Sequence, residues 1–414
     1  MIKPTLFMAT IRPAAAAGSA TAAVAGALLV LLAAAALCSG SSSATGDEAE
    51  LIASTGSMSI TTRGRVVVPA MHVFGDSLVD AGNNDFLPAP APKAVPPNGV
   101  DLPRTILWRT GRFTNAYNLA DIIAQQVGFR RSPPAYLSLT PLSRQLDLLR
   151  GRVGTNYASG GSGILDVTGN GTITLREQVE LFATTKARIL RAGLVGRESL
   201  DGLLGRSLFV ISTGGNDFGA FVDPGGVPLS QAPEFMATMV ADYLNYIKAL
   251  YKLGARRLVL LDILPVGCLP SQRATTADGE CDGDGNYLSE LFNSLLRAEM
   301  AKAVAAAMPA MRYSVASLYN VLSDMIANPT LAGLREVKTA CCGGGKFNGE
   351  VECSVHTNLC ADRDEYLFWD TVHGTQAAYR RAVRAFFYGT TREAEPINLH
   401  QLLQEQYYHS TATA

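Results

Sequence analysis

Apolar, β-rich runs alternate with amphipathic helical patterns along most of this 414-residue chain, and that alternation limits the possible folds most strongly. The strand-like runs cover residues 66–74, 207–212, 257–263 and 312–316. The helical patterns cover residues 115–127, 232–253, 284–308 and 375–387. Alternation of this kind is typical of a parallel sheet with helices on both faces, in which sites form beyond the carboxyl ends of the strands.

Four short segments lie where strands end or in loops, and together they carry the chemistry. They are residues 74–78, 158–161, 214–217 and 370–373. Ser77 in the first segment follows a buried strand and is the candidate nucleophile, with a helical turn expected after it to place backbone N–H groups nearby. The chain has no Gly-x-Ser-x-Gly motif, which argues against an α/β-hydrolase.

The last segment supplies an acid and a base three residues apart, Asp370 and His373. This spacing lets the carboxylate hold one imidazole nitrogen while the other faces Ser77. The chain has five histidines, and the other four lie in the first strand, among the cysteines and in the polar tail. His373 is therefore the predicted base. An ordinary Asp-Ser turn and an Asp helix cap are the alternative interpretations of these residues.

Two further residues are candidates for an oxyanion hole. The N–H of Gly160 and the side-chain amide of Asn216, with the N–H of Ser77, would provide three donors to a developing negative charge. Glycine-rich turns are also common without any function, so these residues gain meaning only from the others. No segment predicts a metal site or a cofactor site.

The N-terminus reads as a targeting segment. Positive charges at Lys3 and Arg12 precede an apolar core and then small residues, so residues 1–44 are predicted to be a signal peptide. A retained membrane anchor is the alternative, although the core is short for a span. Three divisions complete the predicted organisation: a loose mature N-terminus at 45–65, one catalytic domain at 66–390, and a polar tail at 391–414.

Composition excludes some partners and supports export. The formal net charge of −1 gives no electrostatic case for nucleic acid, and nothing after the leader predicts stable membrane insertion. Cys38 would leave with the predicted leader, so an even number of cysteines remains, which favours disulfides in an exported chain. They are Cys268, Cys281, Cys341, Cys342, Cys353 and Cys360. Cys268 is expected to pair with Cys281, and the pairing of the later four stays open.

A zinc site is the alternative for the later four cysteines and His356, but the spacing lacks paired C-x-x-C motifs. Asn170-Gly171-Thr172 is a glycosylation sequon, which would also be consistent with export. Residues 88–97 contain five prolines and are expected to form a stiff loop near the site entrance.

The chain resembles the plant GDSL esterase/lipase family of the SGNH hydrolase superfamily. The resemblance rests on Gly75-Asp76-Ser77-Leu78 and on stretches at 78–84, 110–115, 156–163, 253–257, 265–270, 341–343 and 368–370. It implies a three-layer α/β/α sandwich with a mostly parallel, flavodoxin-like sheet. It also implies Ser77 as nucleophile, His373 as base, Asp370 as its orienting acid, and Gly160 and Asn216 as oxyanion donors. The family usually has proline after the catalytic histidine, whereas this chain has Gly374, which is expected to loosen the His373 loop.

These observations predict a secreted serine esterase or lipase of the apoplast or cell wall. It would act on a small-molecule or lipid ester through an acyl-enzyme, without a cofactor. An acyltransferase with the same triad is one alternative, because an alcohol would replace water. A catalytically silent extracellular binding protein is the other. The sequence does not identify the ester or the oligomeric state.

Overall fold

The computed structural model describes residues 68–103, 110–140, 142, 154–193, 195–222 and 226–404. Within these residues a six-stranded sheet has the order β2-β1-β3-β4-β5-β8. Its strands are β1 (Met71–Gly75), β2 (Gly154–Asn156), β3 (Leu208–Ser212), β4 (Arg257–Leu261), β5 (Arg312–Ala316) and β8 (Ala394–Glu395). The first five are parallel, and β8 is antiparallel to β5. The 2-1-3-4-5 order is that of flavodoxin-like sheets, as predicted.

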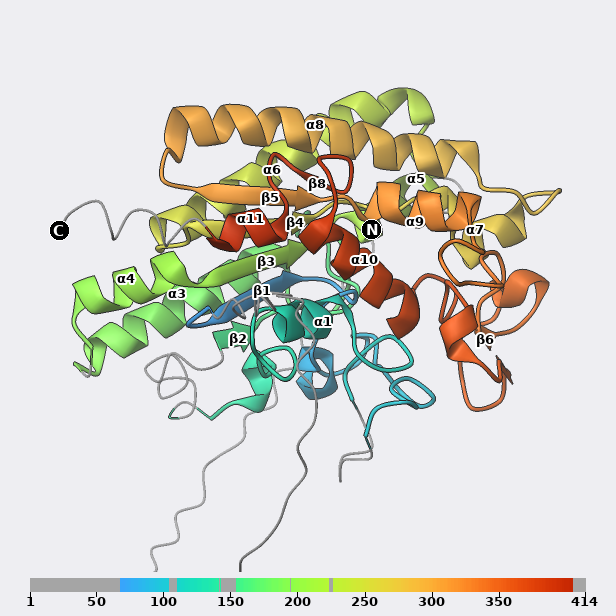
Figure 1. Cartoon of the computed structure of the whole chain (residues 1–414), viewed down its shortest axis with the longest axis horizontal. Coiled ribbons are helices and arrows are strands. Elements are labelled where there is room, and N and C mark those ends of the chain that lie inside the picture. The colour runs from blue at the N-terminus through green and yellow to red at the C-terminus, as the bar shows by residue number, and fades with distance from the viewer. Residues whose placement is uncertain are drawn as a thin grey trace, which may run out of the picture. The chain divides into compact units, whose positions relative to one another are not determined.

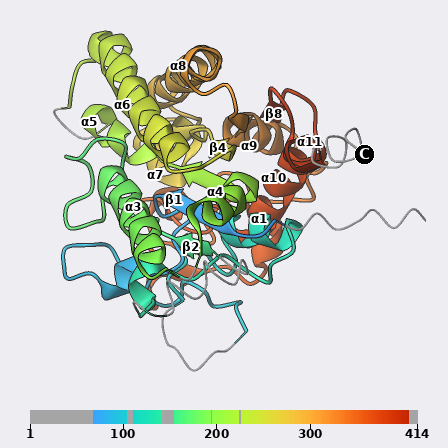
Figure 2. The same cartoon turned by 90° about the vertical axis from the view of Figure 1, so that its left-hand side faces the viewer.

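Helices cover both faces of the sheet (Figures 1 and 2). On one face lie α3 (Leu175–Arg191) and α6 (Ala232–Lys252), and α8 (Gly283–Ala307) packs against α6. On the other face lie α1 (Leu119–Gln126), α10 (Gln376–Tyr388) and α11 (Leu399–Gln404), with α9 (Leu318–Ala327) against α10. The remaining described α-helices and strands are α4 (Arg197–Arg206), α5 (Gly219–Val222), α7 (Pro270–Thr275), β6 (Cys342–Gly343) and β7 (Asn358–Leu359). The chain is therefore a three-layer α/β/α sandwich.

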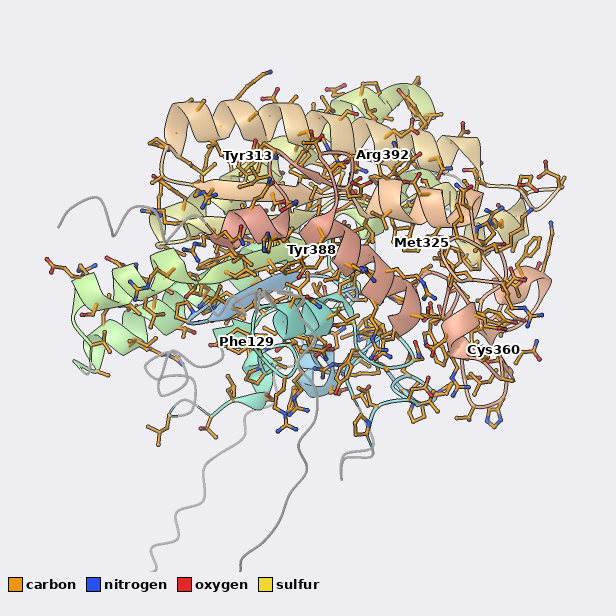
Figure 3. The ribbon with its side chains drawn as sticks, in the orientation of Figure 1. Phe129, Tyr313, Met325, Cys360, Tyr388 and Arg392 are labelled. Atoms are coloured by element: carbon orange, nitrogen blue, oxygen red, sulfur yellow. A yellow bond between two sulfur atoms is a disulfide. The ribbon has the colours of Figure 1, made fainter. Side chains whose placement is uncertain are left out.

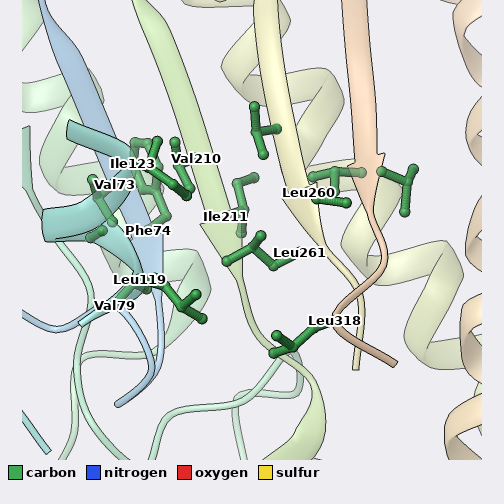
Figure 4. Packing of buried hydrophobic residues seen from close by; sticks show 14 of the residues in the cluster. Val73, Phe74, Val79, Leu119, Ile123, Val210, Ile211, Leu260, Leu261 and Leu318 are labelled. Carbon is green, nitrogen blue, oxygen red and sulfur yellow. The ribbon is translucent and has the colours of Figure 1, made fainter. Parts of the chain in front are cut away.

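The central strands are hydrophobic because both of their faces are covered. Every residue of β1, β3 and β4 is buried. Figure 4 shows Val73 and Phe74 of β1 with Val210 and Ile211 of β3 in this packing. The register pairs Gly75, the last residue of β1, with Ser212, the last residue of β3. The segments that follow these two strands therefore leave the sheet at the same edge.

The domain extends beyond its predicted end at residue 390. The prediction of a polar tail at 391–414 is wrong for residues 394–404, because β8 closes the sheet edge beside β5 and α11 packs on β5. Leu399, Leu402 and Leu403 of α11 are buried. Three apolar residues in a six-residue helix are too few to give a recognisable helical period in the sequence, so the helix was not predicted. The predicted leader and loose N-terminus at 1–65 lie outside the described residues.

Three disulfides cross-link residues between positions 268 and 360. Cys268 pairs with Cys281, which confirms that prediction, and the later four cysteines pair as Cys341–Cys360 and Cys342–Cys353. We call residues 341–360 the stapled segment; Figure 3 labels Cys360 within it. Backbone N–H groups of Cys341 and Cys342 donate to the carbonyls of Phe368 and Trp369. The stapled segment thus supports the chain just before Asp370.

Reduction of these disulfides is expected to lower stability. Closing loops of this size contributes about 2–4 kcal/mol each, mainly by restricting the unfolded chain. The midpoint of urea unfolding, measured with and without reductant, checks this expectation. An alkylating agent without reductant is the control and should leave the midpoint unchanged. An equal midpoint after complete reduction, verified by thiol mass mapping, would show that the bridges do not stabilise the fold.

Across the described residues, we find no helix whose length and hydropathy would suit a membrane span.

Candidate active site

Ser77 is presented by a tight turn at the end of β1. Gly75 has a φ of 129°, and a Cβ there would lie 1.8 Å from the carbonyl oxygen of Ser212, so only glycine fits between β1 and β3. The N–H of Asp76 then donates to that same carbonyl at 2.9 Å. A single helical turn follows, with the N–H of Asp80 donating to the carbonyl of Asp76. Ser77 is therefore held, partly buried, at the start of this turn.

His373 and Asp370 complete a hydrogen-bonded series with Ser77. The Nε2 of His373 lies 2.7 Å from the Oγ of Ser77. Its Nδ1 lies 2.8 Å from Oδ2 and 2.9 Å from Oδ1 of Asp370. Both His373 and Asp370 are 8% exposed. The structure thus brings Ser77 into contact with a histidine that lies 296 positions later in the sequence.

The turn that carries Asp370 and His373 is hydrogen-bonded within itself. Oδ1 of Asp370 accepts the backbone N–H groups of Val372 at 3.0 Å and His373 at 2.8 Å. The N–H of Trp369 donates to the carbonyl of His373. Thr375 then caps α10 by accepting the N–H of Ala378. The local sequence therefore sets the geometry between Asp370 and His373.

The electrostatic surroundings favour a protonated imidazole. Burial alone would lower the pKa of His373, but the charge and hydrogen bond of Asp370, with a further contribution from Asp76, raise it above the ordinary value of 6.5. Burial raises the pKa of Asp76 to about 7, opposed by the N–H of Leu78 and the charge of His373. The imidazolium that forms when a serine is deprotonated is therefore stabilised here.

The loop after β2 crosses the end of β1, but the N–H of Gly160 is already engaged. The N–H of Ser159 donates to the carbonyl of Gly75, which fixes the loop. The N–H of Gly160 donates to Oδ2 of buried Asp80 at 3.0 Å. Within the described part of the chain, by contrast, the N–H of Gly161 makes no backbone hydrogen bond. Gly161 has a φ of 86°, a conformation that favours glycine.

Asn216 and Asp217 hold the third segment beside that loop. One N–H of the Asn216 amide donates to the carbonyl of Ser162 at 2.9 Å, so its second amide hydrogen remains for another acceptor. Asp217 accepts the N–H groups of Ile164 and Leu165 and the hydroxyl of Thr168. This carboxylate ties the third segment to the loop that follows the second segment.

Sequence reasoning gave no role to Phe113, Asp80 or Asp217. The ring of Phe113 stacks on His373 with centroids 5.6 Å apart. A Cβ at Gly160 would lie 2.5 Å from the Phe113 ring, so a glycine is needed there for packing. Phe113 and Asp80 lie in motifs that carry the resemblance, and Asp217 lies in the candidate segment 214–217. An aspartate in a glycine-rich turn is a signal of backbone bracing that could have found two of them.

The predicted glycosylation sequon and the proline-rich loop both lie in described parts of the structure. Asn170 lies in an exposed loop between two glycines of positive φ. The proline-rich loop reaches the site loop through Pro92, whose carbonyl accepts from Asn84, while the same Asn84 amide donates to the carbonyl of Gly160.

A serine, histidine and aspartate hydrogen-bonded in series are the side chains that serine-dependent hydrolases use, and the geometry at this sheet edge fits that class. Residues 71–386 match the family model of the GDSL-like lipase/acylhydrolases. The chain belongs to that family and is a carboxylic ester hydrolase.

Relatives of known sequence are similar over most of the chain. The Arabidopsis thaliana GDSL esterase/lipase At4g28780 is 34% identical over 345 residues, covering 81% of this chain and 90% of that protein. GDSL esterase/lipase LTL1 of the same organism is 36% identical over 338 residues, covering 80% and 89%. A solved carbohydrate esterase aligns with a TM-score of 0.29 and 13% identity, covering 59% of this chain and 57% of that one.

Proposed function

We propose that the protein is a secreted serine esterase or lipase that hydrolyses small-molecule or lipid esters through an acyl-enzyme on Ser77. The observation that carries this proposal is the 2.7 Å contact between Ser77 Oγ and His373 Nε2, continued to Asp370. In the first half-reaction, His373 removes the hydroxyl proton as Ser77 Oγ bonds to the ester carbonyl carbon. The tetrahedral intermediate then releases its alcohol, which takes the proton from His373.

In the second half-reaction, water replaces the alcohol. His373 removes a proton from water as its oxygen attacks the acyl carbon, and the proton passes to Ser77 Oγ as the acid is released. Asp370 does not take up the proton; it orients the ring and stabilises the imidazolium. No step needs an oxidant, a reductant or a second substrate beyond water.

For the oxyanion hole we propose the N–H groups of Ser77 and Gly161 and the side-chain amide of Asn216. The hydrogen bond from Gly160 to Asp80 favours Gly161 over Gly160 as the second backbone donor. The bond from Asn216 to the carbonyl of Ser162 supports its role, because it anchors the amide while leaving one hydrogen for substrate.

Export is supported by the predicted leader at 1–44 and by the three disulfides, because disulfides persist in oxidising compartments. N-terminal sequencing of material recovered outside the cell would locate the cleavage site. A chain that retains residues 1–36 in a membrane fraction would support the anchor instead.

Labelling with a fluorophosphonate tests the catalytic proposal directly. This reagent phosphonylates an activated serine, and peptide mapping should place the adduct on Ser77. Ester hydrolysis should fall in parallel with labelling. An adduct on another serine, or hydrolysis that survives complete labelling, would contradict the proposal.

Asn216→Ala is expected to lower kcat by about 10² to 10³, with a smaller change in KM, because its amide acts mainly on the transition state. Steady-state kinetics on a soluble ester check this. Thr168→Val is the matched control, since it removes a hydroxyl bonded to neighbouring Asp217 but no proposed donor. A drop in Thr168→Val equal to that in Asn216→Ala would indicate a general disturbance of the segment.

The pH profile of kcat/KM is expected to rise through a midpoint above 6.5, because only neutral His373 accepts a proton and Asp370 holds its pKa above that ordinary value. Asp370→Asn removes the charge and should move the midpoint down while lowering the plateau. Initial rates across pH, with stability checked at each pH, measure both. An acid limb that is identical in the two proteins would mean that another group titrates.

A further inference from the structure

The residue after the catalytic base has an unusual partner. The N–H of Gly374 donates to the phenolic oxygen of Tyr379 at 2.9 Å. Tyr379 lies in the first turn of α10 and is 1% exposed. On the other side of the same residue, the hydroxyl of Thr114 donates to the carbonyl of Gly374 at 2.8 Å. Gly374 is therefore held through both of its backbone polar groups.

Gly374 and Tyr379 also fit each other sterically. A Cβ at position 374 would lie 2.7 Å from Cε1 and 3.1 Å from Cζ of the Tyr379 ring. Any side chain there would force the ring or the loop to move. A proline would in addition lack the N–H that Tyr379 accepts. The tyrosine ring thus fills the space beside the glycine, and its hydroxyl oxygen accepts the N–H of Gly374.

We propose that Tyr379 is a positioning residue, which holds the loop of His373 through Gly374 and so keeps Nε2 aligned with Ser77. The expectation that Gly374 loosens this loop is thereby replaced by one in which a buried side chain restrains it. This inference rests on the proposed role of His373 as the general base.

The hydroxyl of Tyr379 is suited to a constant structural role. Burial raises its pKa, and the charges of Asp370 and Asp76 raise it further, against the N–H of Gly374. The phenol therefore stays neutral across the pH range in which His373 titrates. The restraint on Gly374 would then be the same in both protonation states of the base.

Tyr379→Phe is the first test, because it removes one oxygen and keeps the ring. A neutral hydrogen bond contributes about 0.5–1.5 kcal/mol, so kcat and the rate of fluorophosphonate labelling should fall roughly two- to tenfold, with little change in KM. Tyr243→Phe is the matched control. Tyr243 is also fully buried, and no group of the described chain lies within hydrogen-bond distance of its hydroxyl. Its labelling rate should stay at the wild-type value.

A pair of variants at the contact gives a second test. Gly374→Ala should lower the labelling rate more than Tyr379→Phe, because the new methyl group meets the ring. Adding Tyr379→Leu to Gly374→Ala should recover part of that loss, so the effects should not be additive. Thr114→Val removes the tie on the other side of Gly374 and should also slow labelling, which keeps the proposal testable if Tyr379→Phe does not fold.

Two results would overturn the inference while leaving the proposed function intact. One is a folded Tyr379→Phe protein that labels on Ser77 at the wild-type rate. The other is an equal slowing in Tyr243→Phe. Failure of wild-type Ser77 to label at all would instead contradict the proposed function itself.

Discussion

Ser77→Ala is expected to abolish both fluorophosphonate labelling and nearly all ester hydrolysis while the protein stays folded. The change removes only the oxygen that would form the acyl-enzyme, and the hydrogen bond lost with that oxygen is the one to His373 Nε2. Loss of a nucleophile acting with its base typically lowers kcat by about 10⁶. Residual turnover on an activated ester, compared with circular dichroism of the same sample, measures the effect.

Ser162→Ala is the control for this experiment. Ser162 is a buried serine in the neighbouring loop, but its hydroxyl donates to the carbonyl of Gly75 rather than to an imidazole. It should therefore still be labelled at Ser77. Normal turnover in folded Ser77→Ala would place the nucleophile elsewhere, and the mechanism proposed above would be wrong.

A chain that ends at Tyr388 is expected not to fold cooperatively. It loses β8 and α11, and with them the buried side chains of Leu399, Leu402 and Leu403. Burial of one leucine contributes about 1.5–3 kcal/mol, so three contribute roughly 5–9 kcal/mol, which is comparable to the whole stability of a typical domain. The truncation also exposes the edge of β5 and removes the carbonyl of Ile397, which accepts from the hydroxyl of Ser314.

Thermal unfolding followed by circular dichroism, with limited proteolysis at low temperature, measures this loss. A chain that ends at Gln404 is the control, because it keeps every described contact of β8 and α11. The control should melt as the full chain does. A cooperative transition in the shorter chain near the wild-type temperature would show that β8 and α11 contribute little to the stability of the domain.

Long periodic elements were predictable from the sequence, and short ones were not. β5 begins and ends where the apolar run predicted, and α6 and α8 lie within a residue of their predicted limits. These segments have enough residues for a period to be evident. β2 has three residues and β8 has two, so neither has a pattern of its own; each is defined by its partner in the sheet.

The candidate site likewise has parts that could be predicted from the sequence and parts that could not. Ser77, Asp370 and His373 could be predicted because their residue types and order are specific to the chemistry. The direction of a peptide N–H could not, since it depends on which acceptor the fold brings close, as Asp80 does for Gly160. Tyr379 lies outside every motif, and only the packing of α10 against the loop places its hydroxyl on Gly374.

Asp370 and His373 share one internally hydrogen-bonded turn, so within the triad only the contact at Ser77 Oγ joins distant parts of the chain. Mild heating or a weak denaturant that separates this loop from β1 would therefore stop turnover while Asp370 and His373 stay hydrogen-bonded to each other. Activity lost in this way should return on cooling as soon as the loop packs against β1 again, because the hydrogen bond between Asp370 and His373 does not have to re-form.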